Sequence, residues 1–352
     1  MTGIPARGHP LHTRSLTLVL RRGEGGSTQL RGHILDLRKT GFVPMPDGLQ
    51  TAGIIHHMLI DARVGADRRL EALETAQPFV AVEPSEASGG ECCRDPASRL
   101  QALVGQRFDA DFPVALSRNF GGALGCSHLL TLFHLAASTL PPALEAEEAV
   151  LRESGARRRV GERYFGRSVF VDGHEPGQGL LQLAVQLSDF HSVPAAAAVE
   201  RLDHLAQQHE VRASCDIELS GVRIAKLAAR ERARTRDTLS SAEWRDVSAQ
   251  VVDFRGRPVM PGLGNALRAE LGGRAECRRL LDALLQLAPG FIQCMPTLTD
   301  SMISQMAARS GEREEAAGRR SLPDFLALGG ATDSCYMWRA GGPLARVRMP
   351  LD

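Results

Sequence analysis

The chain of 352 residues contains no long apolar run. A membrane-spanning helix needs about 18 or more consecutive apolar residues, so no span of this kind is expected. The first residues, MTGIPARGHPLHTR, also lack the apolar core of a secretory signal, which predicts a cytoplasmic protein. Hydrophobic residues nevertheless make up 43% of the chain, enough to build packed cores and to exclude general disorder.

An excess of charge of one sign is also missing. The formal net charge is +1, and no basic block or long acidic run occurs. Polyanions and anionic membranes bind to dense positive charge, so neither nucleic acid nor a membrane is an expected partner. Lysine is nearly absent, with only Lys39 and Lys226, while arginine is abundant. We interpret this imbalance as genome base composition rather than as phosphate chemistry.

Several common catalytic motifs do not occur. The sequence has no Walker phosphate loop, no Gly-x-Ser-x-Gly elbow and no His-Glu-x-x-His helix. The segment Gly262–Leu267, GLGNAL, lacks the third glycine of a dinucleotide fingerprint. The sequence therefore gives no support to these nucleotide-binding and hydrolase classes.

The cysteines do not form the pattern of a disulfide framework. There are seven of them, an odd number, and Cys92 and Cys93 are adjacent. In a chain of this size, reduced thiols or metal ligands are the more natural interpretation.

The hydrophobic pattern of the first half predicts strands followed by helices. The predicted strands cover 14–22, 29–38 and 52–64, and the predicted helices cover 67–76, 95–106 and 127–140. Pro141 and Pro142 are expected to end the last helix. Along the strand 52–64, alternation places His56 on one face and His57 and Asp61 on the other.

The second half repeats this order of elements. In pattern, 167–190 resembles 31–64, the predicted helix 195–208 resembles 67–76, and 242–294 resembles 98–138, with an extra helical stretch at 224–244. In this match Cys277 falls on Cys126 and Arg279 falls on His128, while Gln182 or Ala184 stands near the place of His56. We therefore predict an α+β fold: a tandem duplication of a small antiparallel sheet covered by helices, packed as a pseudo-dimer.

These patterns divide the chain into five parts. They are a flexible N-terminus (1–13), an N-terminal repeat with the candidate site (14–142), a charged linker (143–162), a degenerate second repeat (163–305) and a C-terminal extension (306–352).

A cysteine and a histidine stand close together in the motif GALGCSHLL. Cys126 lies at the start of a predicted helix, where unpaired backbone amides should lower the pKa of its thiol, and His128 follows two residues later. His56 lies among apolar neighbours on its strand, and Cys93 precedes a helix in a Gly-rich loop; the spacing of Cys93 to the following helix favours it over Cys92. If strand, loop and helix meet, two sulfur and two nitrogen ligands would suit tetrahedral zinc, and also iron.

These segments resemble a bacterial family known as a domain of unknown function, DUF2889. Its pattern runs His-Asp-Met on a strand, a cysteine, Leu-x-Gly and then Gly-Cys-Thr-His-Leu. Ser127 replaces the threonine here, and His57 replaces the aspartate. The resemblance covers about 14–140 and implies no assigned activity. The residues that match the pattern are His56, Met58, Cys93, Gly125, Cys126, His128 and Leu129.

The predicted order of elements is also similar to the iron–sulfur scaffold fold of the IscU and SufE type. In that fold a ligand pair follows the strand entry, one cysteine precedes the middle helix and another heads the last helix. His56, Cys93 and Cys126 would occupy the corresponding places, which gives a reason for the three segments to converge.

We therefore expect a metal-dependent enzyme of the hydrolase or lyase type that acts on a small organic substrate. Zinc or iron would sit on His56, Cys93, Cys126 and His128 with an open position, and Asp61 or His57 would be the nearest base. A non-catalytic metal or iron–sulfur carrier and a metal-free interaction protein are the two alternatives.

Overall fold

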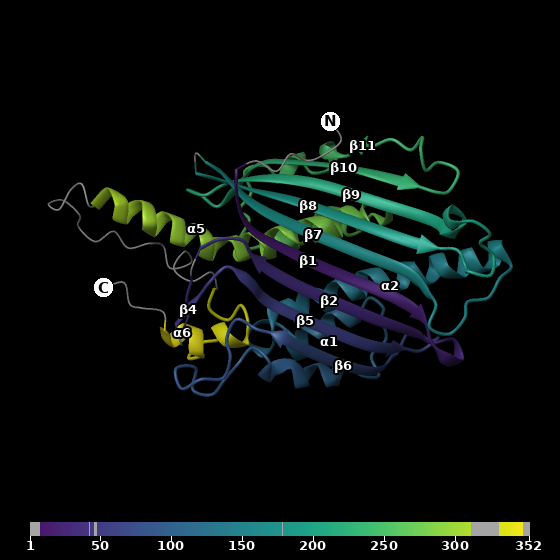
Figure 1. Ribbon diagram of the computed structural model, residues 1–352, viewed down its shortest axis with the longest axis horizontal. Helices are drawn as coiled ribbons and strands as arrows, with labels where there is room; N and C mark the ends of the chain where they lie inside the picture. Colours follow the sequence, from purple (N-terminus) through teal and green to yellow (C-terminus); the bar gives the residue numbers. More distant parts are fainter. Residues whose placement is uncertain (1–7, 42, 46–47, 178, 311–330, 348–352) are drawn as a thin grey trace.

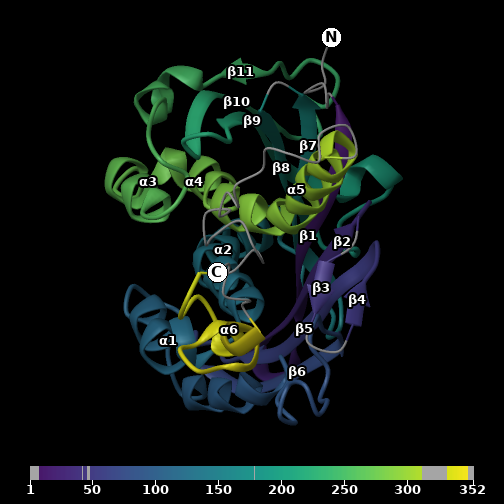
Figure 2. The ribbon, with the colours of Figure 1, turned by 90° about the vertical axis from the view of Figure 1, so that its left-hand side faces the viewer.

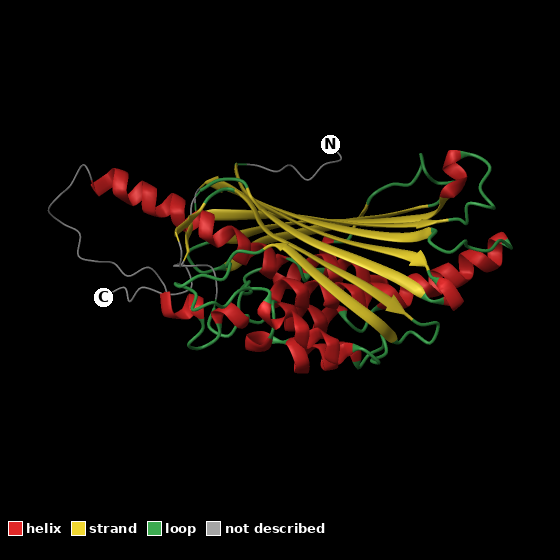
Figure 3. Cartoon of the chain, turned by 60° about the horizontal axis from the view of Figure 1, so that its bottom comes forward, coloured by secondary structure: helices red, strands yellow, loops and turns green. Residues whose placement is uncertain are grey.

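The computed structural model describes residues 8–41, 43–45, 48–177, 179–310 and 331–347. Its main feature is a nine-stranded antiparallel sheet. The helices gather on one face of this sheet, within its curve, and leave the other face open (Figures 1, 2 and 3). The α+β class is therefore confirmed.

The strand order across the sheet is β11-β10-β9-β8-β7-β1-β2-β5-β6, so each half of the chain supplies one block of strands. The first and the second block meet where β1 and β7 pair in antiparallel fashion. A separate hairpin joins β3 (Val43–Met45) and β4 (Gly48–Gln50). The strands of the large sheet are β1 (His9–Arg22), β2 (Thr28–Arg38), β5 (Gly53–Val64), β6 (Leu70–Phe79), β7 (Arg163–Gly177), β8 (Leu180–Ser192), β9 (Leu205–Glu218), β10 (Arg223–Arg234) and β11 (Arg245–Asp246).

Each block of strands is followed by helices. Within the described residues, none of these helices combines the length and the apolarity that crossing a membrane requires. Two 3-10 segments, Asp95–Leu103 and Tyr336–Trp338, lie close to the site described below. The α-helices are α1 (Phe112–Phe120), α2 (Ser127–Ser154), α3 (Leu263–Leu271), α4 (Arg278–Leu284), α5 (Leu287–Ser310) and α6 (Pro343–Val347).

Alternating burial along the strands builds the core. On β1, Leu16 and Leu18 point toward the helices and are fully buried, whereas Ser15 and Thr17 are half-buried on the open face. This period-two pattern is typical of an antiparallel sheet covered on one side. The buried residues of both halves form a single hydrophobic cluster, so the two blocks of strands share one core.

The helices predicted over 67–76, 195–208 and 224–244 are wrong. The first is mostly β6 and the third is mostly β10. The second is a turn, a short 3-10 segment (Arg201–His204) and the start of β9. A bulge explains the misleading spacing, because Leu70 and Leu73 are three residues apart and both are buried on the inner face, with a register shift between them. Ile224 and Leu227 repeat this arrangement on β10.

The helix α2 does not end at Pro141 and Pro142 but continues to Ser154. Each proline removes one backbone hydrogen bond, and burial of side chains beyond them offsets this loss. Residues 143–154 of the predicted charged linker accordingly belong to α2, and the linker is packed against the rest of the chain. Its Glu147 and Arg158 are only 5% and 9% exposed and form a buried bidentate ion pair, with N–O distances of 2.8 and 3.0 Å.

The predicted flexible N-terminus and C-terminal extension are also partly structured. β1 begins at His9 and includes residues that we expected to be mobile, while residues 1–7 lie outside the described range. In the C-terminal extension, residues 306–310 belong to α5, and 331–347 pack against the first half of the chain through a hydrogen bond from the Tyr336 amide to the Gly125 carbonyl, at 2.8 Å. Residues 311–330 and 348–352 are outside the described range.

Candidate metal centre

A buried carboxylate lies at the centre of the candidate site. Asp36 on β2 is fully buried, and Arg14, its cross-strand partner on β1, donates to both carboxylate oxygens at 2.8 and 3.0 Å. Burial alone would raise the pKa of Asp36, but the positive charge of Arg14 and the hydrogen bond with His128 outweigh it and hold that pKa well below its usual range. The carboxylate is therefore ionised and fixed in orientation.

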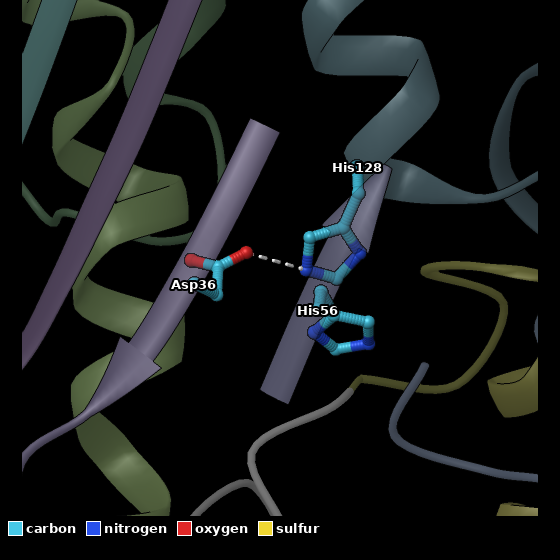
Figure 4. Close-up of side chains that lie close together, drawn as sticks. All are labelled: Asp36, His56 and His128. Atoms are coloured by element: carbon cyan, nitrogen blue, oxygen red, sulfur yellow. Dashed lines mark ion pairs between the residues drawn. The ribbon is translucent and has the colours of Figure 1, made fainter. Parts of the chain in front are cut away.

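Two histidines converge on this carboxylate. His56 on β5 is the cross-strand partner of Asp36, and His128 lies in the first turn of α2. The Nε2 atom of His128 lies 3.1 Å from Oδ2 of Asp36, and the two imidazole rings are 3.8 Å apart between centroids (Figure 4). One ligand atom from each of the three residues falls within 4.8 Å of the others, so the trio could hold a metal ion.

Both imidazoles are held in their neutral form. Burial lowers the pKa of His56 well below 6.5, and neighbouring His128 adds to this effect. Burial also lowers the pKa of His128, although Asp36 acts in the opposite direction. Neutral imidazole is the form that binds metals.

The His128 ring lies between the sulfur of Cys126 and the carboxylate of Asp36. The Cys126 thiol donates to Sδ of Met58 at 3.6 Å, because a thioether can only accept. The sulfur of Cys126 also lies 3.8 Å from Nδ1 of His128. Because an ionised carboxylate is a stronger acceptor than a sulfur, the ring proton of His128 lies on Nε2 and is donated to Asp36 at 3.1 Å.

A cavity of about 190 Å³ opens beside the two histidines. The 3-10 segment Asp95–Leu103, α2, α5 and residues 331–347 all contribute to its wall, and most of the side chains that line it are apolar. The lining includes Ile55, Val82, Cys93, Pro96, Cys126, Gln293, Cys335, Met337, Trp338 and Leu344.

The structure brings His56, Cys93, Cys126 and His128 to this one cavity. The two cysteines, however, are not part of the trio of ligand atoms. We expected a lowered thiol pKa at the helix start, but burial raises the pKa of Cys126 to about 12 and that of Cys93 well above 9.0. Both thiols are therefore protonated in the absence of a metal.

The two predicted bases are not at this cavity. Asp61 and His57 lie on the opposite face of β5 from His56, as the alternation requires. Asp61 is 46% exposed and pairs with Arg31 at 2.8 Å, while His57 stacks on His33. Neither residue can act on a substrate bound beside His56, and this corrects their assignment as catalytic residues.

Sequence reasoning missed Asp36, Arg14 and Gln293. A signal for the first two existed, since each places a charge two residues from a buried apolar residue on the same strand face, Ile34 for Asp36 and Leu16 for Arg14. Gln293 gave no such signal, because it comes from α5 and reaches His128 Nε2, at 3.2 Å, only through the tertiary fold.

A second cluster with the same plan lies in the other half of the sheet. Arg167 on β7 donates to both oxygens of Asp189 on β8, at 2.6 and 2.8 Å, and the two residues are 22 apart in sequence, as are Arg14 and Asp36. The cross-strand partner of Asp189 is His209 on β9. The place corresponding to His56 is therefore taken by His209, and not by Gln182 or Ala184.

The fourth member of this second cluster is an arginine. Arg279 donates from Nε to Oδ2 of Asp189 at 2.9 Å, in the place where His128 faces Asp36. This agrees with the sequence match of Arg279 to His128. A permanent positive charge thus stands where the first cluster has a neutral imidazole.

A family model described as "Protein of unknown function (DUF2889)" matches residues 12–140, which contain Asp36, His56 and His128. Comparisons with curated proteins and with solved structures found no match. The analogy with the IscU and SufE type is therefore unsupported, and the helix at 67–76 on which it depended is the strand β6. Residues 12–140 of this chain are similar to the DUF2889 family, which supports the resemblance carried by the sequence motifs.

Proposed function

We propose that this chain is a metal-dependent enzyme of the hydrolase or lyase type, with Asp36, His56 and His128 as the metal ligands. The convergence of one carboxylate and two neutral imidazoles within 4.8 Å, beside a cavity of about 190 Å³, carries this proposal. The set differs from the one expected from sequence, because Asp36 replaces the two cysteines.

The contacts of the two histidines support a cation at this point. A bound cation would replace the Nε2 proton that His128 donates to Asp36 at 3.1 Å, so that the imidazole and the carboxylate would both become ligands. His56 Nδ1 is buried and has no hydrogen-bond partner among the described residues. A buried polar atom without a partner destabilises the fold by about 1–3 kcal/mol, which a ligand would remove.

Two imidazoles and one carboxylate suit zinc or iron(II) and leave coordination positions open for water or substrate. A bound metal would polarise a substrate carbonyl or activate water. Arg14 would orient Asp36 through both oxygens, and Cys126 would orient the His128 ring through Nδ1. The apolar cavity wall would exclude bulk water and accept a small organic substrate.

Metal content is the direct test of this proposal. The purified chain, loaded with Zn²⁺ or anaerobically with Fe²⁺ and then dialysed, is expected to retain about one ion per chain. His56→Gln should weaken binding by more than the roughly 100-fold that loss of an outer hydrogen-bond partner produces. His209→Gln, at the corresponding place in the second cluster, is the matched control and should leave the content unchanged. Equal content in both variants would contradict the proposal.

Cys126→Ser distinguishes the ligand set proposed here from the set with two cysteines that the sequence predicted. On our assignment the serine variant keeps its metal, with an affinity lowered by about 10–100-fold because the His128 ring loses its orienting partner. Complete loss, to the level of His56→Gln, would instead support the set His56, Cys93, Cys126 and His128. Cys277→Ser serves as control for the removal of a buried thiol.

A non-catalytic metal or iron–sulfur carrier is the second candidate. Three thiols, those of Cys93, Cys126 and Cys335, line the same cavity as the two histidines, and thiolates are the usual iron–sulfur ligands. Visible absorbance in anaerobically purified protein, lost in Cys93→Ser, would favour this function over the enzyme.

We also propose that the two halves arose by duplication and pack as a pseudo-dimer about the β1–β7 pair. The repeated Arg–Asp–His plan supports this origin, as does a repeated backbone contact. The Gly105 amide bonds to the Leu70 carbonyl at 2.7 Å, and the Gly256 amide bonds to the Ile224 carbonyl at the same distance. The second half would then have lost the metal site when arginine took the place of His128.

A further inference from the structure

The second cluster borders a small pocket of its own. This pocket has a volume of about 50 Å³ and lies between α2, α4 and the strands β7 to β9. Its polar lining includes Arg167, Asp189, His209, Arg278 and Arg279.

The charges of this pocket do not cancel. Arg167 pairs with two carboxylates, those of Asp189 and Asp282, and its hydrogen bond to Asp282 is 2.5 Å long. Arg278 is exposed and forms no ion pair among the described residues. Arg279 shares Asp189 with Arg167, so the lining carries a net positive charge.

The geometry of Arg279 leaves its charged end available. Only its Nε is used, by Asp189 at 2.9 Å, and its side chain is 36% exposed. Within the described part of the chain, the two Nη groups have no hydrogen-bond partner. A guanidinium anchored at Nε presents these remaining N–H groups in one plane, which matches the two oxygens of a carboxylate or a phosphate.

We propose that this pocket is a binding site for an oxyanion, the carboxylate or phosphate group of a small ligand, held by Arg278 and Arg279. The side chain of Arg279 supplies the positive charge that a metal would supply beside Asp36. The inference goes beyond the proposed function and does not depend on metal binding in the first half.

Calorimetric titration of the full-length chain with inorganic phosphate, and separately with acetate, tests the site. A chelator removes metal from the solution, so that the first cluster contributes no cation. At least one of the two anions is expected to bind with a dissociation constant on the order of 1 mM. The anion that binds identifies the ligand chemistry as phosphate or carboxylate.

Arg279→Gln should weaken this binding at least about ten-fold, and Arg278→Gln should weaken it in the same direction. Arg257→Gln is the control, since Arg257 is an exposed arginine of the same half that faces Glu270 at 3.5 Å. Equal binding in the wild type and in Arg279→Gln would overturn the proposal, as would an equal loss in the control or no binding of either anion. Repeating the titration with His56→Gln separates this result from the metal site, because that variant should bind the anion normally.

Discussion

Asp36→Asn is expected to lower the free energy of unfolding by about 3–5 kcal/mol. Arg14 is 2% exposed, and the substitution removes the only charge that its guanidinium pairs with among the described residues. An uncompensated buried charge destabilises a protein far more than the net strength of the ion pair would indicate. Urea denaturation at pH 7 with a chelator present measures the difference without a contribution from metal binding.

Asp61→Asn provides the control on the same sheet. Its pair with Arg31 has the same 2.8 Å distance but is largely exposed, so a change below about 1 kcal/mol is expected. Replacing both buried partners, Arg14→Met with Asp36→Leu, should recover most of the loss. If Asp36→Asn and Asp61→Asn lowered the free energy of unfolding by similar amounts, burial would not explain the effect of removing the partner of Arg14.

Acidification from pH 6.5 to pH 4 is expected to destabilise the chain steeply. Burial lowers the pKa values of His12, His134 and His209 from 6.5 to about 4. In this range the unfolded chain takes up protons that the folded chain does not, so stability falls as the pH falls. Each such histidine contributes about 1.4 kcal/mol per pH unit at most, less where it is partly exposed, and the three together contribute up to about 4 kcal/mol per unit.

The histidine contribution can be isolated by its pH window and by a variant. Carboxylates with lowered pKa values, such as Asp36 and Asp189, begin to lose their contribution only near their ordinary pKa of about 3.9. His134→Leu, which lies on α2 six residues after His128 and copies Leu285 after α4, should reduce the slope by up to about 1.4 kcal/mol per pH unit. Unfolding free energies measured by urea at several pH values give this slope, and an unchanged slope would contradict the assignment.

Local pattern was sufficient to predict several parts of the site. Alternation on 52–64 placed His56 on the inner face and His57 and Asp61 on the outer one, as β5 has them. The motif around Cys126 placed it directly before the first turn of α2, and the α+β class followed from the strand patterns.

The parts that could not be predicted depend on pairing between distant segments. The ligand role that we propose for Asp36 depends on β2 lying between β1 and β5 in one register, with Arg14 on one side and His56 on the other. A shift of one residue would turn Asp36 to the open face. The bulges on β6 and β10 likewise gave both strands the spacing of a helix, which is why both were assigned to the wrong class.

The pairing of β1 with β7 also determines how each half of the chain would behave alone. Separating the halves after α2 would expose the full length of β1 as a bare sheet edge, with unpaired amides and carbonyls beside buried leucines. An isolated first half would have to find a substitute for β7, and a second copy of β1 is the nearest one. Such a fragment is therefore expected to self-associate edge to edge rather than to persist as a monomer.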